Sequence, residues 1–291
     1  MAVTLASNAP VGKLFLVGTP IGNLEDITFR ALQTLKSVDL IACEDTRRTQ
    51  KLLNHYQIQT PTVSYHEHNE VTRAPELILE MEDGSAVALV SDAGMPGLSD
   101  PGYRLAHLAI RHKIPVIPIP GVSALVTALA AAGLPIERFI FAGFLPSKKG
   151  ARLKTLKGLS VFDRTLVFYE APHRVVEMLA DTLEVLGDRQ MTLARELTKA
   201  HEEFLRGTVS EVLAELRKRS VKGEITLVIG PPEAVTAKPA RARRSLRKEI
   251  EQVIKEQGLD ERAALKAVAR SWGVPRSELY RRWVREKATN P

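Results

Sequence analysis

The 291-residue chain contains little cysteine, few aromatic residues and no long apolar run. Its single cysteine, Cys43, excludes an intramolecular disulfide and a zinc site built from cysteines. The longest apolar run, near Val122–Ala132, is too short to span a membrane, and Met1–Pro10 lacks the pattern of a secretory signal. The histidines show no spacing typical of metal ligands. These absences predict a cytoplasmic protein without a metal site.

The positive charge of the chain is concentrated near its C-terminal end. The formal net charge is +7, but residues 238–291 hold 15 lysines and arginines against 7 acidic residues, a net charge of +8. The rest of the chain is therefore close to neutral, with a net charge of −1. This asymmetry is typical of a polyanion-binding tail on a neutral body.

Apolar segments alternate with amphipathic ones along the first half of the chain. Lys13–Gly18 and Ala86–Val90 are typical of strands, and the helical patterns between such strands predict βαβ units and a mainly parallel sheet. Pro75 is expected at the first position of one of these helices. In the second half, several strands follow one another closely, which predicts antiparallel pairing in a mixed sheet. We therefore expect two α/β domains, residues 1–132 and 133–232.

A small third domain is predicted at the C-terminal end. Residues 233–243, rich in proline and alanine, predict a linker, and residues 244–291 begin with helical stretches. A turn centred on Gly273 and a helix capped by Ser277 then match helix-turn-helix geometry. The last helix offers basic side chains for RNA phosphates and aromatic side chains for stacking, namely Arg281, Arg282, Arg285, Tyr280 and Trp283. The alternative is a small helical cap packed on the body, with solvated arginines.

A polar loop follows the apolar strand Ala86–Val90. It holds Asp92 and Asp100 together with three glycines. Open α/β sheets bind ligands at the carboxyl ends of their parallel strands, so this loop is the expected centre of an active cleft. The alternative is that the two aspartates only cap turns or helices.

Five short motifs occur in an order that resembles one protein family. They are Val17–Leu24, Ala42–Arg47, Ser91–Pro96, Pro120–Gly121 and Phe168–Glu170. Over nearly its whole length the chain resembles the tetrapyrrole methylase superfamily of S-adenosylmethionine (SAM) enzymes, and within it the branch that modifies ribosomal RNA. The run Glu44–Arg47 is the most specific element. The resemblance implies a homodimer that binds SAM between two α/β domains and methylates the 2′-hydroxyl of a cytidine in 16S rRNA, as free rRNA or in the small ribosomal subunit.

The resemblance also implies which residues bind the cofactor. They are Pro20 and Ile21 at the first turn, Asp92 and Met95 beside the amino-acid and ribose parts, Ser123 and Ala124 at a helix start, and Tyr169 and Leu197 on the adenine side. The Gly-rich first turn usual in the superfamily is here Gly-Thr-Pro-Ile-Gly, a departure that fits the RNA branch.

Methyl transfer from a sulfonium to a ribose hydroxyl needs in-line geometry and a base that accepts the hydroxyl proton. The sulfonium already contains a good leaving group, so no metal is required. The candidates for the base are Glu44, Asp45 and Lys222, at or near predicted strand ends. Two alternatives remain open, because Asp45 would also serve as a helix N-cap and Lys222 as a solvated charge.

The RNA-facing surface of the body is expected to be basic. Its predicted members are Arg47, Arg48, Lys51, Lys148, Lys149 and Arg152. Arg47 would contact a phosphate or instead form a salt bridge with Glu44. Few aromatic side chains lie near candidate loops, namely Tyr65, Tyr103, Phe144 and Tyr169, so shape and ribosome context are expected to carry part of the specificity.

Two other functions fit parts of the sequence. Methylation of a small molecule such as a corrin precursor would need no basic tail and would leave Glu44 and Asp45 unexplained. A SAM-sensing transcription regulator would use the helix-turn-helix to read DNA. Such a regulator should bind a specific duplex and show no methyl transfer.

Overall fold

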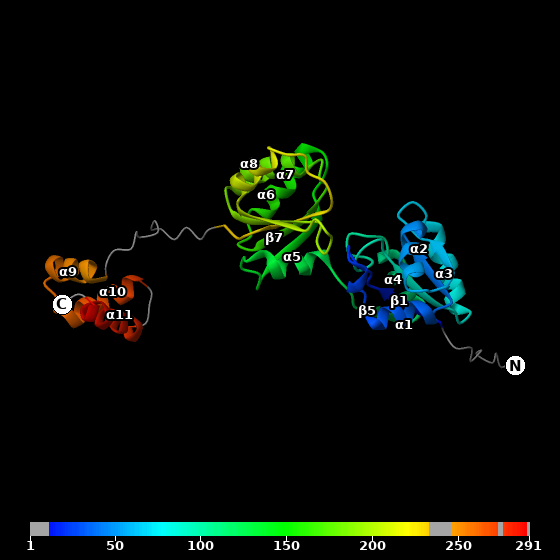
Figure 1. Cartoon of the computed structure of the whole chain (residues 1–291), viewed down its shortest axis with the longest axis horizontal. Helices are drawn as coiled ribbons and strands as arrows, with labels where there is room; N and C mark the ends of the chain where they lie inside the picture. Colours follow the sequence, from blue (N-terminus) through cyan, green and yellow to red (C-terminus); the bar gives the residue numbers. More distant parts are fainter. Residues whose placement is uncertain (1–11, 233–245, 273–275, 290–291) are drawn as a thin grey trace, which may run out of the picture. The chain divides into compact units, whose positions relative to one another are not determined.

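The computed structural model describes residues 12–232, 246–272 and 276–289. The chain divides into two compact units, Met1–Ala234 and Val235–Pro291. The first unit holds two five-stranded sheets with their helices (Figure 1). The predicted linker at 233–243 lies outside the described residues.

The first sheet is entirely parallel, with strand order β3-β2-β4-β1-β5. Its strands are β1 (Lys13–Val17), β2 (Leu40–Cys43), β3 (Thr62–Ser64), β4 (Ala86–Val90) and β5 (Val116–Ile119). The connecting helices are the short η1 (Leu24–Asp26) and α1 (Phe29–Ser37), α2 (Thr46–His55), α3 (Glu70–Glu82) and α4 (Tyr103–Arg111). Central β4 is continuously apolar because Val87 and Leu89 face one core while Ala88 and Val90 face the other. The predicted parallel sheet is confirmed.

The second sheet is mixed, as predicted, with strand order β6-β7-β10-β8-β9. Only β6 and β7 pair in parallel among its described strands, and the other pairs are antiparallel. The strands are β6 (Phe139–Phe144), β7 (Thr165–Glu170), β8 (Gln190–Arg195), β9 (Glu203–Thr208) and β10 (Ile225–Ile229). Helices α6 (Lys149–Leu159), α7 (Val175–Leu186) and α8 (Val209–Leu216) cover one face, and α5 (Ala124–Ala132) covers the other (Figure 1).

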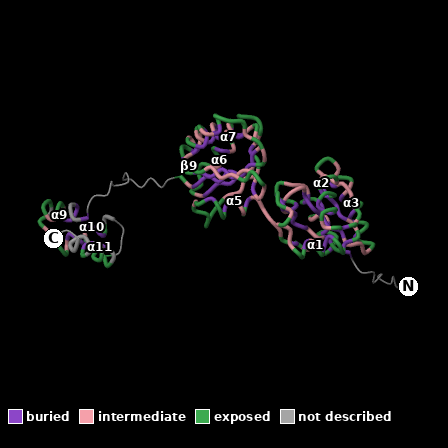
Figure 2. Tube along the Cα trace, in the orientation of Figure 1, coloured by how far each residue is buried: buried purple, intermediate pink, exposed green. Residues whose placement is uncertain are grey.

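Helix α5 lies before residue 132, the predicted end of the first domain, yet it packs on the second sheet. Its apolar residues contact Val167 and Val228 of that sheet, and the Thr192 hydroxyl donates a hydrogen bond to the Ala132 carbonyl at 2.8 Å. Buried residues accordingly run through α5 as well as through the strands (Figure 2). The segment between β5 and α5 therefore connects the two sheets.

The second unit contains α9 (Leu246–Gln257), α10 (Glu261–Trp272) and α11 (Arg276–Thr289), which pack around a small core of their own. Trp283 was expected to offer a stacking surface, and this is wrong, because it is buried in that core and donates a hydrogen bond to Glu261 at 2.9 Å. Arg281 is exposed, whereas the side chain of Arg282 and the predicted turn at Gly273 lie outside the described parts. None of the helices in the described ranges is both long and apolar enough to cross a bilayer.

Candidate active site

A cavity of about 370 Å³ lies where loops at the carboxyl end of the first sheet meet the second sheet. Seven of the eight residues predicted to bind the cofactor line it, namely Ile21, Asp92, Met95, Ser123, Ala124, Tyr169 and Leu197. The eighth, Pro20, instead lines a hollow of about 330 Å³ that shares Ile21 and Asp92 with the cavity. The structure thus brings the predicted positions together, and their binding of a cofactor stays a prediction.

The loops after three neighbouring strands hold one another in place at the floor of this region. Backbone hydrogen bonds join Thr19 and Gly94 in both directions, at 2.9 and 3.1 Å, and the Thr19 hydroxyl donates to the Ser91 carbonyl at 3.1 Å. A side chain at Gly18 would come within 2.8 Å of the sulfur of Met95 and of the backbone of Gly121. Glycine at position 18 therefore allows the loops after β1, β4 and β5 to approach closely.

Asp92 connects the loops after β2 and β4. One of its carboxylate oxygens accepts a hydrogen bond from the backbone N–H of Asp45 at 3.1 Å. The other lies 3.4 Å from the guanidinium of Arg48, which also lines the cavity. These contacts hold the Asp92 carboxylate at the cavity wall.

The cavity is strongly acidic. Its described lining carries five carboxylates, Glu44, Asp92, Asp100, Glu170 and Glu224, and only one lysine or arginine, Arg48. Burial, followed by repulsion from Glu44, raises the pKa of Asp100 to about 7. Burial also raises the pKa of Glu44 and of Glu170 above the usual range. An acidic cavity with apolar walls favours a cationic ligand.

Two of the three predicted catalytic residues lie outside the lining of the cavity. Asp45 is the N-cap of α2, where it accepts a hydrogen bond from the Arg47 N–H at 2.9 Å and also binds the Arg47 guanidinium. Those hydrogen bonds lower the pKa of Asp45 to about 2. Lys222 is exposed, and its carbonyl accepts a hydrogen bond from Arg195. Glu44 is the one of the three that lines the cavity.

The predicted basic surface is present in part. Arg47 is exposed but pairs with Asp45 rather than Glu44, and Lys51 is exposed beside the second hollow. Lys148 and Lys149 are exposed at the start of α6, although the Lys149 ammonium lies 3.7 Å from Asp181.

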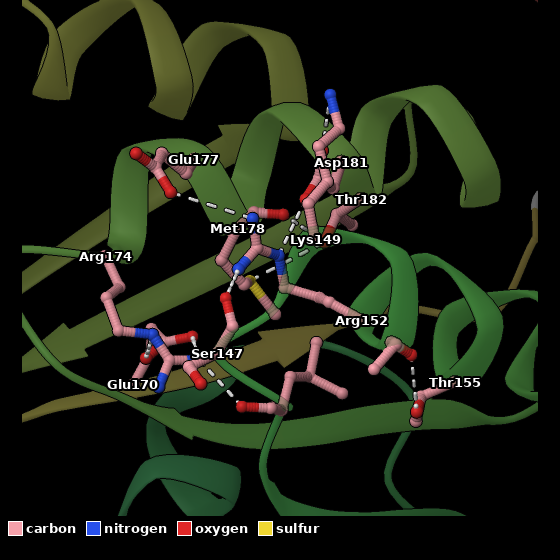
Figure 3. Close-up of polar contacts among 12 residues, drawn as sticks. Ser147, Lys149, Arg152, Thr155, Glu170, Arg174, Glu177, Met178, Asp181 and Thr182 are labelled. Atoms are coloured by element: carbon pink, nitrogen blue, oxygen red, sulfur yellow. Dashed lines mark hydrogen bonds and ion pairs between the residues drawn. The ribbon is translucent and has the colours of Figure 1, made fainter.

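Arg152 does not face RNA, so its assignment to the RNA-facing surface is wrong. The side chain is only 2% exposed, and Figure 3 shows it enclosed by α7 and the loop before α6. Its Nε donates to Asp181 at 2.6 Å and its Nη1 to the Ser147 carbonyl at 3.0 Å. A signal for this burial was present in the sequence, because Arg152 stands four residues before buried Leu156 on the same helix face.

Sequence reasoning also missed residues of the cavity. Asp100 was expected in the cleft as part of the loop after β4 but was given no role of its own, and Glu170 was expected only as the last residue of the motif Phe168–Glu170. Phe144 was expected only as an aromatic side chain near a candidate loop, and Glu224 was not expected at all. Both line the cavity because of how β6 and β10 are placed in the second sheet. No local pattern marks Glu224, since a single acidic residue before a strand has many explanations.

Comparison with known proteins places this geometry in a family. The family model described as Tetrapyrrole (Corrin/Porphyrin) Methylases matches residues 13–213. A protein named ribosomal RNA small subunit methyltransferase I from Halalkalibacterium halodurans is 50% identical over 271 residues, covering 92% of this chain and 93% of the relative. The protein of the same name from Bacillus subtilis is 44% identical over 272 residues, covering 93% of each chain.

Solved structures share the fold at lower identity. The cobalamin biosynthetic enzyme cobalt precorrin-4 methyltransferase aligns with a TM-score of 0.59 at 18% identity, covering 75% of this chain and 94% of that one. Uroporphyrin-III C-methyltransferase from Thermus thermophilus, complexed with S-adenosylhomocysteine, aligns with a TM-score of 0.54 at 22% identity, covering 78% and 100%. Together with the family match over most of the sequence, these findings establish that the chain belongs to the tetrapyrrole methylase family.

Proposed function

We propose that this chain is a SAM-dependent methyltransferase that methylates the 2′-hydroxyl of a cytidine in 16S rRNA. The observation that carries the proposal is the acidic cavity, which gathers seven of the eight predicted cofactor positions. The choice of rRNA over a small molecule is supported by relatives 44–50% identical that are named ribosomal RNA small subunit methyltransferase I.

The residues of the cavity fit SAM. Its volume of about 370 Å³ is in the range of small-molecule sites. The carboxylates of Asp92 and Asp100 suit the ammonium and sulfonium charges, and the apolar side chains of Ile21 and Leu197 suit the adenosine. When bound, SAM supplies an activated methyl group and its own leaving group.

We assign the proton acceptor to Glu44, with Asp100 as its electrostatic partner. Glu44 follows β2, lines the cavity and is partly withdrawn from water, so its carboxylate is more basic than an exposed one. Burial, followed by repulsion from Glu44, raises the pKa of Asp100 to about 7, so Asp100 is partly protonated near neutral pH in the ligand-free protein, and a cationic ligand would favour its charged form. Asp45 is left with the N-cap role that its contacts support.

RNA would approach over the exposed basic side chains of α2 and of the segment at the start of α6. Exposed Arg47, Lys51 and Lys148, with Arg48 and Lys149, would contact phosphates. The tail, through Arg281 and Arg282, would add a second docking surface for 16S rRNA or the small subunit. We further propose that the enzyme acts as a homodimer in the cytoplasm, and light scattering of the full chain in solution tests the dimer.

Incorporation of tritium from labelled SAM tests the methyl transfer itself. The substrates are small ribosomal subunits and bare rRNA from a strain that lacks the enzyme, with a porphyrinogen as the small-molecule alternative. The proposal is supported if the unmodified protein labels the rRNA and the Glu44→Gln variant does not. Label in the porphyrinogen alone supports a small-molecule methylase, and binding of a specific DNA duplex without any transfer supports a regulator.

A further inference from the structure

Strand β6 contains one residue more than its pairing with β7 requires. Phe141 lies opposite Val167, but Phe144 lies opposite Tyr169, so three steps on β6 match two on β7. Gly143 supplies the irregularity with a φ of +60°, which glycine adopts without strain. Because strand side chains alternate between faces, one inserted residue moves the following side chain to the other face.

This bulge decides where the Phe144 ring lies. In the regular part of β6, Ile140 packs with the core under α6–α8, and Phe141 faces α5. Without the bulge, Phe144 would fall on the same face as Ile140. Instead its ring centroid lies 5.7 Å from that of Tyr169, on the side of Phe141. There the side chain lines the cavity and remains 54% exposed. An aromatic ring is thus presented to whatever enters from solvent.

Two arginines fix the loop that follows this ring. Arg174 donates to the Leu145 carbonyl at 2.7 Å and lies 3.3 Å from the carboxylate of Glu170. Arg152 donates to the Ser147 carbonyl at 3.0 Å while it is paired with Asp181. Figure 3 shows both guanidinium groups directed to the same loop. The backbone after Phe144 is therefore held at two carbonyls, those of Leu145 and Ser147.

The charge of the surroundings changes sign at the Phe144 ring. The cavity behind it is acidic, whereas residues 145–160 contain five basic residues and no acidic one. Arg152 is buried, which leaves Lys148, Lys149, Lys154 and Lys157 exposed. A ligand that spans this border needs a flat apolar face beside a negatively charged chain. A nucleotide within RNA has both.

We propose that the base of the acceptor nucleotide stacks on Phe144, and that Arg152 and Arg174 are positioning residues for the loop that holds it. The inference rests on the proposed rRNA methylation and names the base-contacting residue of that site. Loss of an aromatic side chain on which a base stacks weakens binding roughly ten- to hundredfold.

The test compares Phe144→Ala, Phe144→Tyr and Phe162→Ala in the full chain. Phe162 is the matched control, since it is 44% exposed but does not line the cavity. We expect Phe144→Ala to raise the KM for the rRNA substrate roughly ten- to hundredfold. SAM affinity, measured by calorimetry, should not change. Phe144→Tyr should restore the KM, and Phe162→Ala should behave as the unmodified protein.

An unchanged KM with Phe144→Ala overturns the inference. Weaker SAM binding with an unchanged KM for RNA also overturns it, because the ring would then contact the adenine of the cofactor. If the unmodified protein methylates no rRNA, the proposed function itself fails, which is a different result.

The positioning role has a separate readout. Arg174→Met should raise the KM for RNA without changing SAM affinity, and Arg174→Lys should restore part of the loss. In a Phe144→Trp background, Arg174→Met should also shift the indole emission to longer wavelength, because the loop no longer holds the ring. Unchanged emission and KM overturn the positioning role.

Discussion

Replacing Asp100 by asparagine should stabilise the ligand-free protein more at pH 8 than at pH 5. The pKa of Asp100 is about 7 instead of 3.8, because burial and the nearby carboxylates disfavour its charge. At a pH between these two pKa values, the folded protein binds more protons than the unfolded chain, so the free energy of unfolding falls as pH rises. Asparagine removes that charge and its cost.

The expected change in the free energy of unfolding follows from the pKa of Asp100. Between pH 5 and about 7, each pH unit costs about 1.4 kcal/mol, which gives an upper limit of about 3 kcal/mol. Asp100 is only partly buried, so solvent screening reduces the effect to about 1–2 kcal/mol. The loss of the carboxylate's hydrogen bond with Ser91 acts at both pH values, and the pH difference isolates the charge.

Urea unfolding at pH 5 and pH 8 measures this difference. Asp83→Asn is the matched control, because Asp83 is an exposed carboxylate just after α3. This variant should change the free energy of unfolding by the same amount at pH 5 and at pH 8. If Asp100→Asn changes the free energy of unfolding equally at pH 5 and pH 8, the cavity does not disfavour the charge of Asp100.

Four further predictions test other parts of the account. Asp92→Ala should weaken SAM binding at least tenfold, since a charge-assisted hydrogen bond contributes about 1.5–3 kcal/mol, and unchanged affinity by calorimetry would contradict an anchoring role. Glu44→Gln should keep SAM affinity and reduce turnover, whereas weaker SAM binding at normal turnover would reverse the assignment. Arg152→Ala should lower the free energy of unfolding by about 3–5 kcal/mol because it leaves Asp181 buried and charged, and a small loss in urea unfolding would argue against a buried ion pair. Truncation after Pro239 should keep SAM binding but weaken binding to the small subunit with a shallower salt dependence, and an unchanged salt slope would leave the tail as a cap.

Much of the fold could be predicted because its signals are local. The apolar run of β4 indicates burial on both faces, and two distinct cores do cover it. Pro75 shows where such signals fail, because α3 begins at Glu70 and contains the proline. The turn before it is held by the Asn69 side chain, which accepts the His66 N–H at 2.8 Å. The helix therefore has a first turn before Pro75, which the position of the proline does not predict.

The site was predictable where it depends on loops at strand ends. Asp92 and Met95 follow β4 and Ser123 follows β5, the two strands that flank β1 in one parallel sheet, so their convergence comes from the topology. Phe144 depends on a single inserted residue in β6, and Arg152 on which side of α6 meets α7. Both are decided by tertiary packing, to which composition and charge patterns are insensitive.

The most direct test of the central claim is the chemical identity of the methylated nucleoside. After reaction with labelled SAM, the rRNA of small subunits from a strain lacking the enzyme is digested to nucleosides and analysed by mass spectrometry. We expect the label in 2′-O-methylcytidine, and we expect Glu44→Gln to abolish it. Label in a base-methylated nucleoside, or in a nucleoside other than cytidine, would contradict the claim.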